Sequence, residues 1–259
     1  MLTKKEKEDL IGFIYSRERP EGGFSFSEST PPTLEDSYFA LSLLEELGEH
    51  YTSKQTVSYI TSLKQRGYTN PKYFYQLASV YRITRLQDRI NALYDVIKLG
   101  DEIVISTLSD LYYMFLTRLM LHIPITLKKN ERDIISSVRL KKVKSMEECK
   151  QLVILMKGMR MVFKSEEYII MIQESQNLDG GFGCVPRSTS FLEHTYNALH
   201  GLKELQAAPV NIKQCERFVR SCLANVGGFG RQMTTIPTLE YSYYAFMSLK
   251  FIDEMKKQR

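Results

Sequence analysis

At 259 residues the chain is long enough to bury a large core, and its 43% hydrophobic and 25% charged residues are ordinary for a globular protein. The formal net charge of +5 is modest, and the dense basic runs are short, at 128–132 and 139–144, which argues against a nucleic-acid-binding face. The N-terminus is charged, and the most apolar stretch, 103–127, is interrupted by Asp110 and Arg118. We therefore expect neither a signal peptide nor a membrane span, and a cytoplasmic location.

Apolar residues recur at helical spacing through most of the chain, and no segment shows the sustained alternation of a strand. Turn residues interrupt this pattern; Pro20 ends the first helix, and Gly48 ends the second as a good residue for a left-handed cap. The sequence therefore predicts an all-α protein of about six helical hairpins in one domain, 1–259. The pairs are expected at 4–18 with 33–47, 53–65 with 72–83, 89–99 with 108–121, 130–138 with 146–162, 165–176 with 191–205, and 212–224 with 239–255.

Three stretches share one pattern, in which nine residues separate a Gly-Gly-Phe turn from a Leu-Glu-x-(Thr/Ser)-Tyr-x-Ala segment. They lie at 22–44, 178–202 and 227–249, in the first, fifth and sixth hairpins. A motif that recurs in this way is typical of a repeat architecture, in which each unit buries its apolar face against its neighbours.

Capping motifs set the expected register of the second helix in each hairpin. Ser190-x-x-Glu193 and Ser145-x-x-Glu148 fit a capping box, and Thr107-x-x-Asp110 is a near match. In this register, five hairpins have an acidic residue at the same position, where its carboxylate stabilises the helix N-terminus. These residues are Glu35, Asp110, Glu148, Glu193 and Glu240. The next position varies in chemistry and is where we expect function, at Asp36, Leu111, Cys149, His194 and Tyr241. The corresponding helices are expected to begin near Leu34, Leu108, Met146, Phe191 and Leu239.

These motifs resemble a known family. The Gly-Gly-Phe turn and the downstream helix that contains His194-Thr-Tyr-x-Ala-Leu-x-Gly-Leu are similar to the repeat of prenyltransferases and squalene cyclases, and the stretch 178–186 is closest to protein prenyltransferase β subunits. The resemblance implies an α/α toroid with an apolar central cavity that binds an isoprenoid. It further implies a peptide or protein acceptor, or a helical partner subunit.

In the prenyltransferases that the chain resembles, zinc is held by an Asp-x-Cys pair at the start of one inner helix and by a histidine at the start of a later one. Here Glu147, Cys149 and His194 stand at those positions, with Glu147 in place of the aspartate. A carboxylate, a thiolate and an imidazole form a reasonable three-ligand zinc set, with one position left for a substrate thiol. The alternative is structural, with Glu147 favoured by the helix dipole and Cys149 packed as a small apolar residue.

The resemblance also implies a site for the isoprenoid diphosphate. The family has basic residues three and six places before its aspartate, where this chain has Lys144 and Lys141. Arg187, in the loop after a Gly-Gly-Phe turn, is a further candidate to bind an anion. The alternative is that all three are solvated loop residues. Aromatic residues near the starts of the second helices either line the cavity or pack as core, at Tyr38, Phe39, Tyr112, Tyr113, Tyr196, Tyr243 and Tyr244.

Two other functions stay open at this stage. The cyclase branch of the superfamily protonates an alkene with an aspartate at the start of an inner helix, and Asp36 is the candidate here. A toroid without catalysis that binds a lipid or a partner segment is the third reading, because the Gly-Gly-Phe turn is absent from hairpins two to four. Fold alone does not decide among them.

Overall fold

The structure, a computed structural model, describes residues 1–64, 70–99, 103–138 and 143–258. Within these ranges the chain is helical and contains isolated β-bridges but no strand, so the prediction of an all-α protein is confirmed. The helices are α1 (Lys4–Tyr15), α2 (Leu34–Glu46), α3 (Lys54–Ser62), α4 (Pro71–Ile83), α5 (Gln87–Leu99), α6 (Leu108–Met120), α7 (Lys129–Ser137), α8 (Met146–Gly158), α9 (Ser165–Glu174), α10 (Leu192–Glu204), α11 (Ile212–Ser221) and α12 (Leu239–Lys257). They follow one another along the chain in the expected order, and of the expected pairs α9 packs against α10 and α11 against α12.

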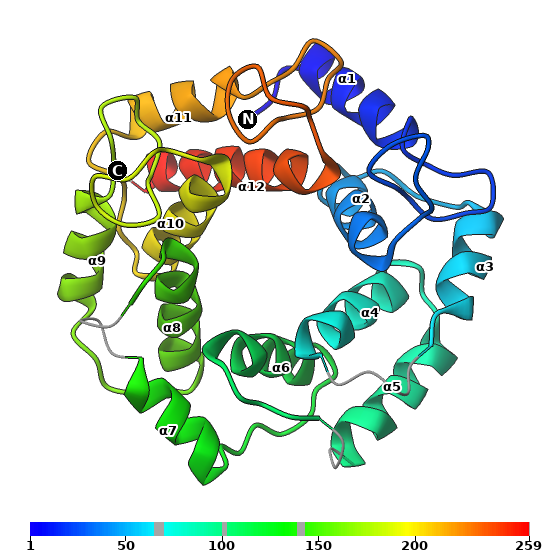
Figure 1. Cartoon of the computed structure of the whole chain (residues 1–259), viewed down its shortest axis with the longest axis horizontal. Coiled ribbons are helices and arrows are strands. Elements are labelled where there is room, and N and C mark those ends of the chain that lie inside the picture. The colour runs from blue at the N-terminus through cyan, green and yellow to red at the C-terminus, as the bar shows by residue number, and fades with distance from the viewer. Residues whose placement is uncertain (65–69, 100–102, 139–142, 259) are drawn as a thin grey trace. The chain divides into compact units, whose positions relative to one another are not determined.

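By packing, the chain divides into two compact units. Unit 1 consists of Met1–Leu10 with Ile135–Arg259, and unit 2 consists of Ile11–Ile134. In unit 1, α8, α10 and α12 lie side by side, with α9 and α11 packed against one side of this layer (Figure 1). In unit 2, α2, α4 and α6 form the corresponding layer. The expectation of a single domain over 1–259 stays a prediction.

The even-numbered helices form the cores of the units because many of their apolar side chains are buried. In α10, for example, Leu192, Ala198, Leu199 and Leu202 are fully buried. Burial of a leucine side chain contributes about 1.5–3 kcal/mol, so packing rather than helix propensity stabilises these segments. None of the described helices combines the length and the apolar character needed to cross a membrane.

Each Gly-Gly-Phe turn is fastened to the helix that follows it. The Phe182 side chain is fully buried, and its main-chain N–H donates to the Thr195 hydroxyl, 3.0 Å away. The turns of the first and sixth hairpins repeat this bond, from Phe24 to Ser37 and from Phe229 to Ser242, each at 3.0 Å. The spacing between the turn and the Thr/Ser of the motif is therefore a structural requirement, because the hydroxyl satisfies a buried N–H.

Replacement of Thr195 by valine is expected to lower the free energy of unfolding by about 1–3 kcal/mol, because the buried N–H of Phe182 loses its acceptor. Denaturant unfolding monitored by circular dichroism measures this. Thr195→Ser keeps the hydroxyl and serves as the matched control. Equal unfolding midpoints for the two variants would contradict this role of the hydroxyl.

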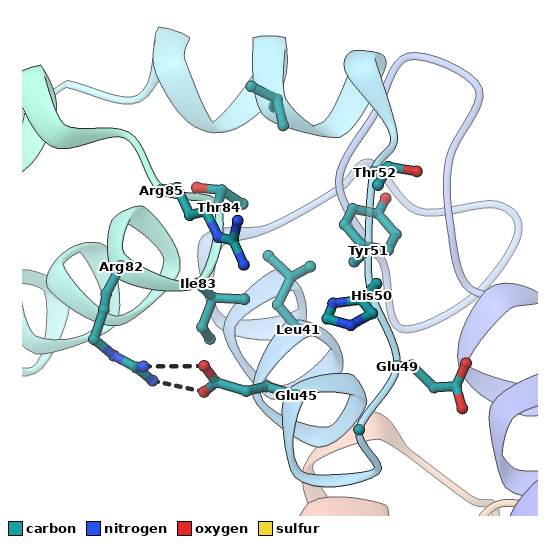
Figure 2. A pocket seen from close by; sticks show the side chains of 12 residues that line it. Leu41, Glu45, Glu49, His50, Tyr51, Thr52, Arg82, Ile83, Thr84 and Arg85 are labelled. Atoms are coloured by element: carbon teal, nitrogen blue, oxygen red, sulfur yellow. Dashed lines mark hydrogen bonds and ion pairs between the residues drawn. The ribbon is translucent and has the colours of Figure 1, made fainter.

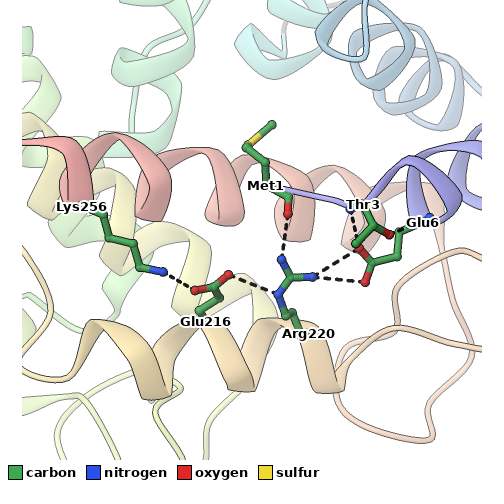
Figure 3. A network of polar contacts seen from close by, with 6 residues as sticks. All are labelled: Met1, Thr3, Glu6, Glu216, Arg220 and Lys256. Carbon is green, nitrogen blue, oxygen red and sulfur yellow. Dashed lines mark hydrogen bonds and ion pairs between the residues drawn. The ribbon is translucent and has the colours of Figure 1, made fainter.

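In unit 1 the first residues of the chain are bound to α11 and α12 by a polar network centred on Arg220 (Figure 3). The Arg220 guanidinium donates to the Glu6 carboxylate at 3.1 Å and to the carbonyl oxygen of Met1 at 2.8 Å. Its Nε donates to Glu216 at 3.2 Å, and Glu216 also pairs with Lys256 of α12. The start of α1 thereby packs with the last hairpin of the chain.

The register predicted for α10 is wrong by one residue. The helix begins at Leu192, with Phe191 at the N-cap and no capping bond from its side chain. Ser190 instead donates to Asp179 and accepts from the Asn177 side chain, each at 2.8 Å. The predicted N-cap at Ser145 is confirmed, since its hydroxyl accepts from the N–H of Glu148.

Candidate functional site

When the second helix of each hairpin is numbered from its first residue, residues with the same number occupy equivalent positions in the six hairpins. The third residues are Asp36, Tyr73, Asp110, Glu148, His194 and Tyr241. The fourth residues are all buried and are Ser37, Phe74, Leu111, Cys149, Thr195 and Ser242. The fifth residues are Tyr38, Tyr75, Tyr112, Lys150, Tyr196 and Tyr243. Cys149 and His194 are therefore not equivalent, which corrects the alignment expected from the capping motifs.

Cys149 occupies the position at which three other hairpins fasten their Gly-Gly-Phe turn. Its side chain is fully buried, and burial raises the pKa of the thiol to about 12. A zinc ligand is bound as the thiolate, so a metal at Cys149 would have to overcome this effect of burial.

His194 lies at the start of α10 and is partly buried against the Phe191 ring, with the ring centroids 5.8 Å apart. The pKa of His194 is lowered, mainly because the side chain is partly buried. The positive charge of Arg231 lowers this pKa further, whereas the negative charges of Glu193 and Glu147 raise it. Glu147 therefore lies close enough to influence the imidazole. Its carboxylate accepts a hydrogen bond from the Gln151 side chain at 3.1 Å.

Across the described ranges of the chain, no three His, Cys, Asp or Glu side chains gather in a way that could hold a metal ion. The predicted ligands Glu147, Cys149 and His194 consequently do not converge as they stand, although Glu147 and His194 share one region. The residues present do not fit a zinc site in this arrangement, and zinc binding stays a prediction.

The predicted diphosphate ligands are spread over two loops. Lys141 lies outside the described residues. Lys144 is exposed just before α8, where its main-chain N–H donates to Glu148 at 2.7 Å. Arg187 is exposed in the loop before α10, with a φ of 69°. Anion binding by Lys144 and Arg187 stays a prediction.

Arg231 follows the last Gly-Gly-Phe turn, as Arg187 follows the one before it. Its guanidinium pairs with Glu193 of α10 at 2.5 Å and stacks on the Phe191 ring at 3.7 Å from the centroid. Phe191 thus contacts both Arg231 and His194. This fixed cation forms part of the surface at the start of α10.

In unit 1, side chains of α10 and α12 form a cluster of aromatic rings centred on Tyr196. Tyr196 stacks on Tyr244 with centroids 4.6 Å apart, and it also contacts Tyr243 at 6.1 Å and Phe251 at 6.2 Å. The His200 ring lies 5.8 Å from Tyr196 and 5.1 Å from Phe251. Tyr243 and Tyr244 are partly exposed, so this face combines a packed base with accessible ring surface.

A similar set of tyrosines lies in unit 2. The Tyr38 and Tyr75 rings are 5.8 Å apart, Tyr75 and Tyr113 are 5.6 Å apart, and Tyr112 contacts Tyr113 at 5.2 Å. The aromatic residues singled out in the sequence therefore gather on the second helices in both units. Their repeated position follows from the shared register rather than from chance composition.

Asp36, the candidate acid of a cyclase, is the third residue of α2. It accepts a hydrogen bond from the Thr33 hydroxyl at 2.8 Å, and its own N–H donates to that oxygen at 3.0 Å. Burial raises the pKa of Asp36, and the Thr33 hydrogen bond opposes the shift. These contacts give Asp36 a role at the helix N-terminus.

Unit 2 also contains a cavity of about 700 Å³ near the C-terminal ends of α2 and α4 (Figure 2). Arg82 on its wall forms two hydrogen bonds with Glu45, at 2.6 and 2.9 Å. The candidate Asp36 lies at the opposite end of α2 and does not line this cavity. The Glu45 pair partly neutralises Arg82, so we assign no anion site to Arg82.

The family model of the prenyltransferase alpha-alpha toroid domain matches residues 1–78, 147–208 and 189–259. The chain belongs to this family. The α/α toroid class expected from the sequence is thereby confirmed, and the match includes the Gly-Gly-Phe turns together with α8, α10 and α12. No curated protein matches the chain.

Among solved structures, the chain is similar to Candida albicans protein geranylgeranyltransferase-I complexed with GGPP. The identity is 15% and the TM-score 0.39, with 99% of this chain and 80% of that chain covered. This likeness is too distant to carry a function across.

Proposed function

We propose that this protein binds an isoprenoid diphosphate, with the isoprenoid chain against the aromatic face of α10 and α12. Membership of the prenyltransferase toroid family supports an isoprenoid ligand. The observation that carries the proposal is the ring cluster around Tyr196, which joins Tyr243, Tyr244 and Phe251 on one face.

This face suits a branched apolar chain for two reasons. The rings hold one another in place, so little conformational freedom is lost when a ligand packs on them. Tyr243 and Tyr244 keep part of their surface accessible, whereas Tyr196 is 8% exposed and forms the base. Binding sites for apolar ligands are usually lined by such aromatic groups with a few polar atoms at one end.

The proposal concerns binding and contains no step through zinc. In the prenyltransferases that the chain resembles, the metal deprotonates the acceptor thiol, but the Cys149 thiol is buried here, and no group of three potential ligands gathers among the described residues. Transfer to a thiol, a peptide acceptor and a helical partner subunit stay predictions from the resemblance.

Titration of the purified protein with farnesyl and geranylgeranyl diphosphate tests the proposal. The chain has sixteen tyrosines and no tryptophan, so its intrinsic fluorescence comes from tyrosine, and Tyr196, Tyr243 and Tyr244 of the proposed face contribute to it. We expect saturable binding that is tighter than that of inorganic pyrophosphate, because the isoprenoid contributes apolar contact. Absence of saturation by both prenyl diphosphates would refute it.

Metal analysis of the same preparation tests the zinc prediction separately. Stoichiometric zinc that is lost in both Cys149→Ala and His194→Ala, with the fold retained, would establish these ligands and would require rearrangement around Cys149. Zinc that persists in Cys149→Ala would rule out the predicted set.

A further inference from the structure

The cavity near the C-terminal ends of α2 and α4 has an arginine side chain directed into it. The cavity encloses about 700 Å³, a size common for small-molecule sites, and all of its lining residues belong to unit 2. The guanidinium of Arg85 points inward, toward Leu41 (Figure 2). Within the described part of the chain, this guanidinium forms no hydrogen bond or ion pair.

The turn after α4 does not itself require an arginine. Arg85 follows this helix with a φ of 57°, and its N–H donates to the Arg82 carbonyl at 3.1 Å. The same place after α2, α8 and α10 is taken by Gly48, Arg160 and Gln206, which have φ values of 76°, 53° and 54°. Several residue types therefore close this turn, so the Arg85 side chain is free to serve the cavity.

The other charged side chains on the walls are already engaged. Arg82 and Glu45 are joined by two hydrogen bonds, at 2.6 and 2.9 Å, so their charges offset each other. The Glu49 side chain points away from Arg85 in Figure 2. Burial and the charge of Glu49 together raise the pKa of Tyr15, which does not line the cavity. The Arg85 guanidinium is therefore the cation that a ligand would meet.

An imidazole and an aliphatic wall complete the lining. The His50 ring belongs to the loop after α2, which lies opposite the Arg85 turn in Figure 2. This ring has no hydrogen-bond partner among the residues that the structure describes. An imidazole carries at least one N–H, which can donate to a ligand oxygen. Leu41, Val57 and Ile83 supply the aliphatic surface beside these two polar groups.

We propose that this cavity binds a monocarboxylate with a short apolar chain, with the carboxylate on Arg85 and His50 and the chain on the aliphatic wall. A guanidinium presents parallel N–H donors that match the two oxygens of a carboxylate. A dianion such as phosphate is disfavoured, because Glu45 and Glu49 also line the cavity and would repel the second charge. Other residues than those of the aromatic face form this site, so it does not depend on the proposed function.

NMR titration of the full chain with hexanoate, hexanol and inorganic phosphate tests the proposal. The chain has four histidines, so the His50 ring signals can be assigned by their loss in His50→Gln. At constant pH, hexanoate should shift these signals saturably. Hexanol lacks the carboxylate and should bind about fivefold more weakly or worse, and phosphate should also bind more weakly than hexanoate.

Arg85→Gln removes the cation and introduces a residue that this turn accepts, since Gln206 stands at the same place after α10. This variant should weaken hexanoate binding about fivefold or more and leave hexanol binding unchanged. Arg160→Gln is the matched control, because Arg160 is an exposed arginine in the same turn after α8 and does not line the cavity. It should leave hexanoate affinity within about twofold of the original.

Glu45→Gln should act in the opposite direction, which a loss of folding cannot do. It frees the Arg82 guanidinium and removes a negative charge from the wall, so hexanoate binding should tighten about twofold or more. Equal affinities for hexanoate and hexanol, or tighter binding of phosphate than of hexanoate, would overturn the proposal. It would equally be overturned if hexanoate left the His50 signals unchanged, or if Arg85→Gln and Arg160→Gln had the same effect.

Discussion

Replacement of Gly180 by alanine is expected to lower the free energy of unfolding by about 3 kcal/mol or more. Gly180 opens the Gly-Gly-Phe turn of the fifth hairpin with a φ of +91°, which L-residues rarely adopt. An added Cβ would also collide with the main-chain carbonyl of Gln214 in α11. The backbone of α11 cannot move away as a flexible side chain could, so the cost of this collision adds to the cost of the unfavourable φ.

Equilibrium unfolding in urea measures this effect, and Gly12→Ala is the control. Gly12 lies inside α1 with open space around its Cβ position, so alanine there should stabilise by about 0.5–1 kcal/mol. Gly227, in the last turn, has a φ of +89° and approaches the carbonyl of Asp9 in the same way. Gly180→Ala with unchanged stability would mean that the turn does not pack on α11 as described.

The hairpins were predictable because each segment carries its own signal. Helical spacing of apolar residues and Gly or Pro at the ends depend on local sequence alone. The Gly-Gly-Phe repeat was equally visible, and the hydrogen bond from Phe182 to Thr195 explains why its spacing is constant. The structural role of the repeat, which is to bond the turn to the following helix, was not visible in the sequence, because the two bonded residues meet only after folding.

The register of α10 was not predictable from a local motif. Ser190 matches a capping residue in sequence, but Asp179 and Asn177 bind its side chain in the folded protein. Those partners lie in the preceding turn, so a tertiary contact overrides the local preference. The one-residue error then aligned Cys149 with His194, which a count from the first residues of the helices separates.

The aromatic face shows the same division between sequence and structure. Tyr196 and its neighbours could be singled out as aromatic residues near helix starts. Which of them forms the base of a cluster depends on how α10 and α12 pack. Only the packing shows that Tyr196 contacts Tyr243, Tyr244, His200 and Phe251 together.

Tyr196→Ala is expected to lower the free energy of unfolding by about 3 kcal/mol and to weaken prenyl diphosphate binding by more than tenfold. The ring is 8% exposed, so its removal leaves a cavity and frees its aromatic neighbours to move. Denaturant unfolding gives the stability, and titration with geranylgeranyl diphosphate gives the affinity.

Tyr168→Ala separates the two effects. Tyr168 is 6% exposed on α9 and packs on Phe163 with centroids 5.6 Å apart, on a helix outside the layer of α8, α10 and α12. Its loss should cost a similar amount of stability without a change in affinity, since it does not belong to the Tyr196 cluster. If Tyr196→Ala folds and binds geranylgeranyl diphosphate as tightly as Tyr168→Ala does, the isoprenoid does not lie on this face. The ligand would then have to be sought on the other aromatic face, where Tyr38, Tyr75 and Tyr113 contact one another in unit 2.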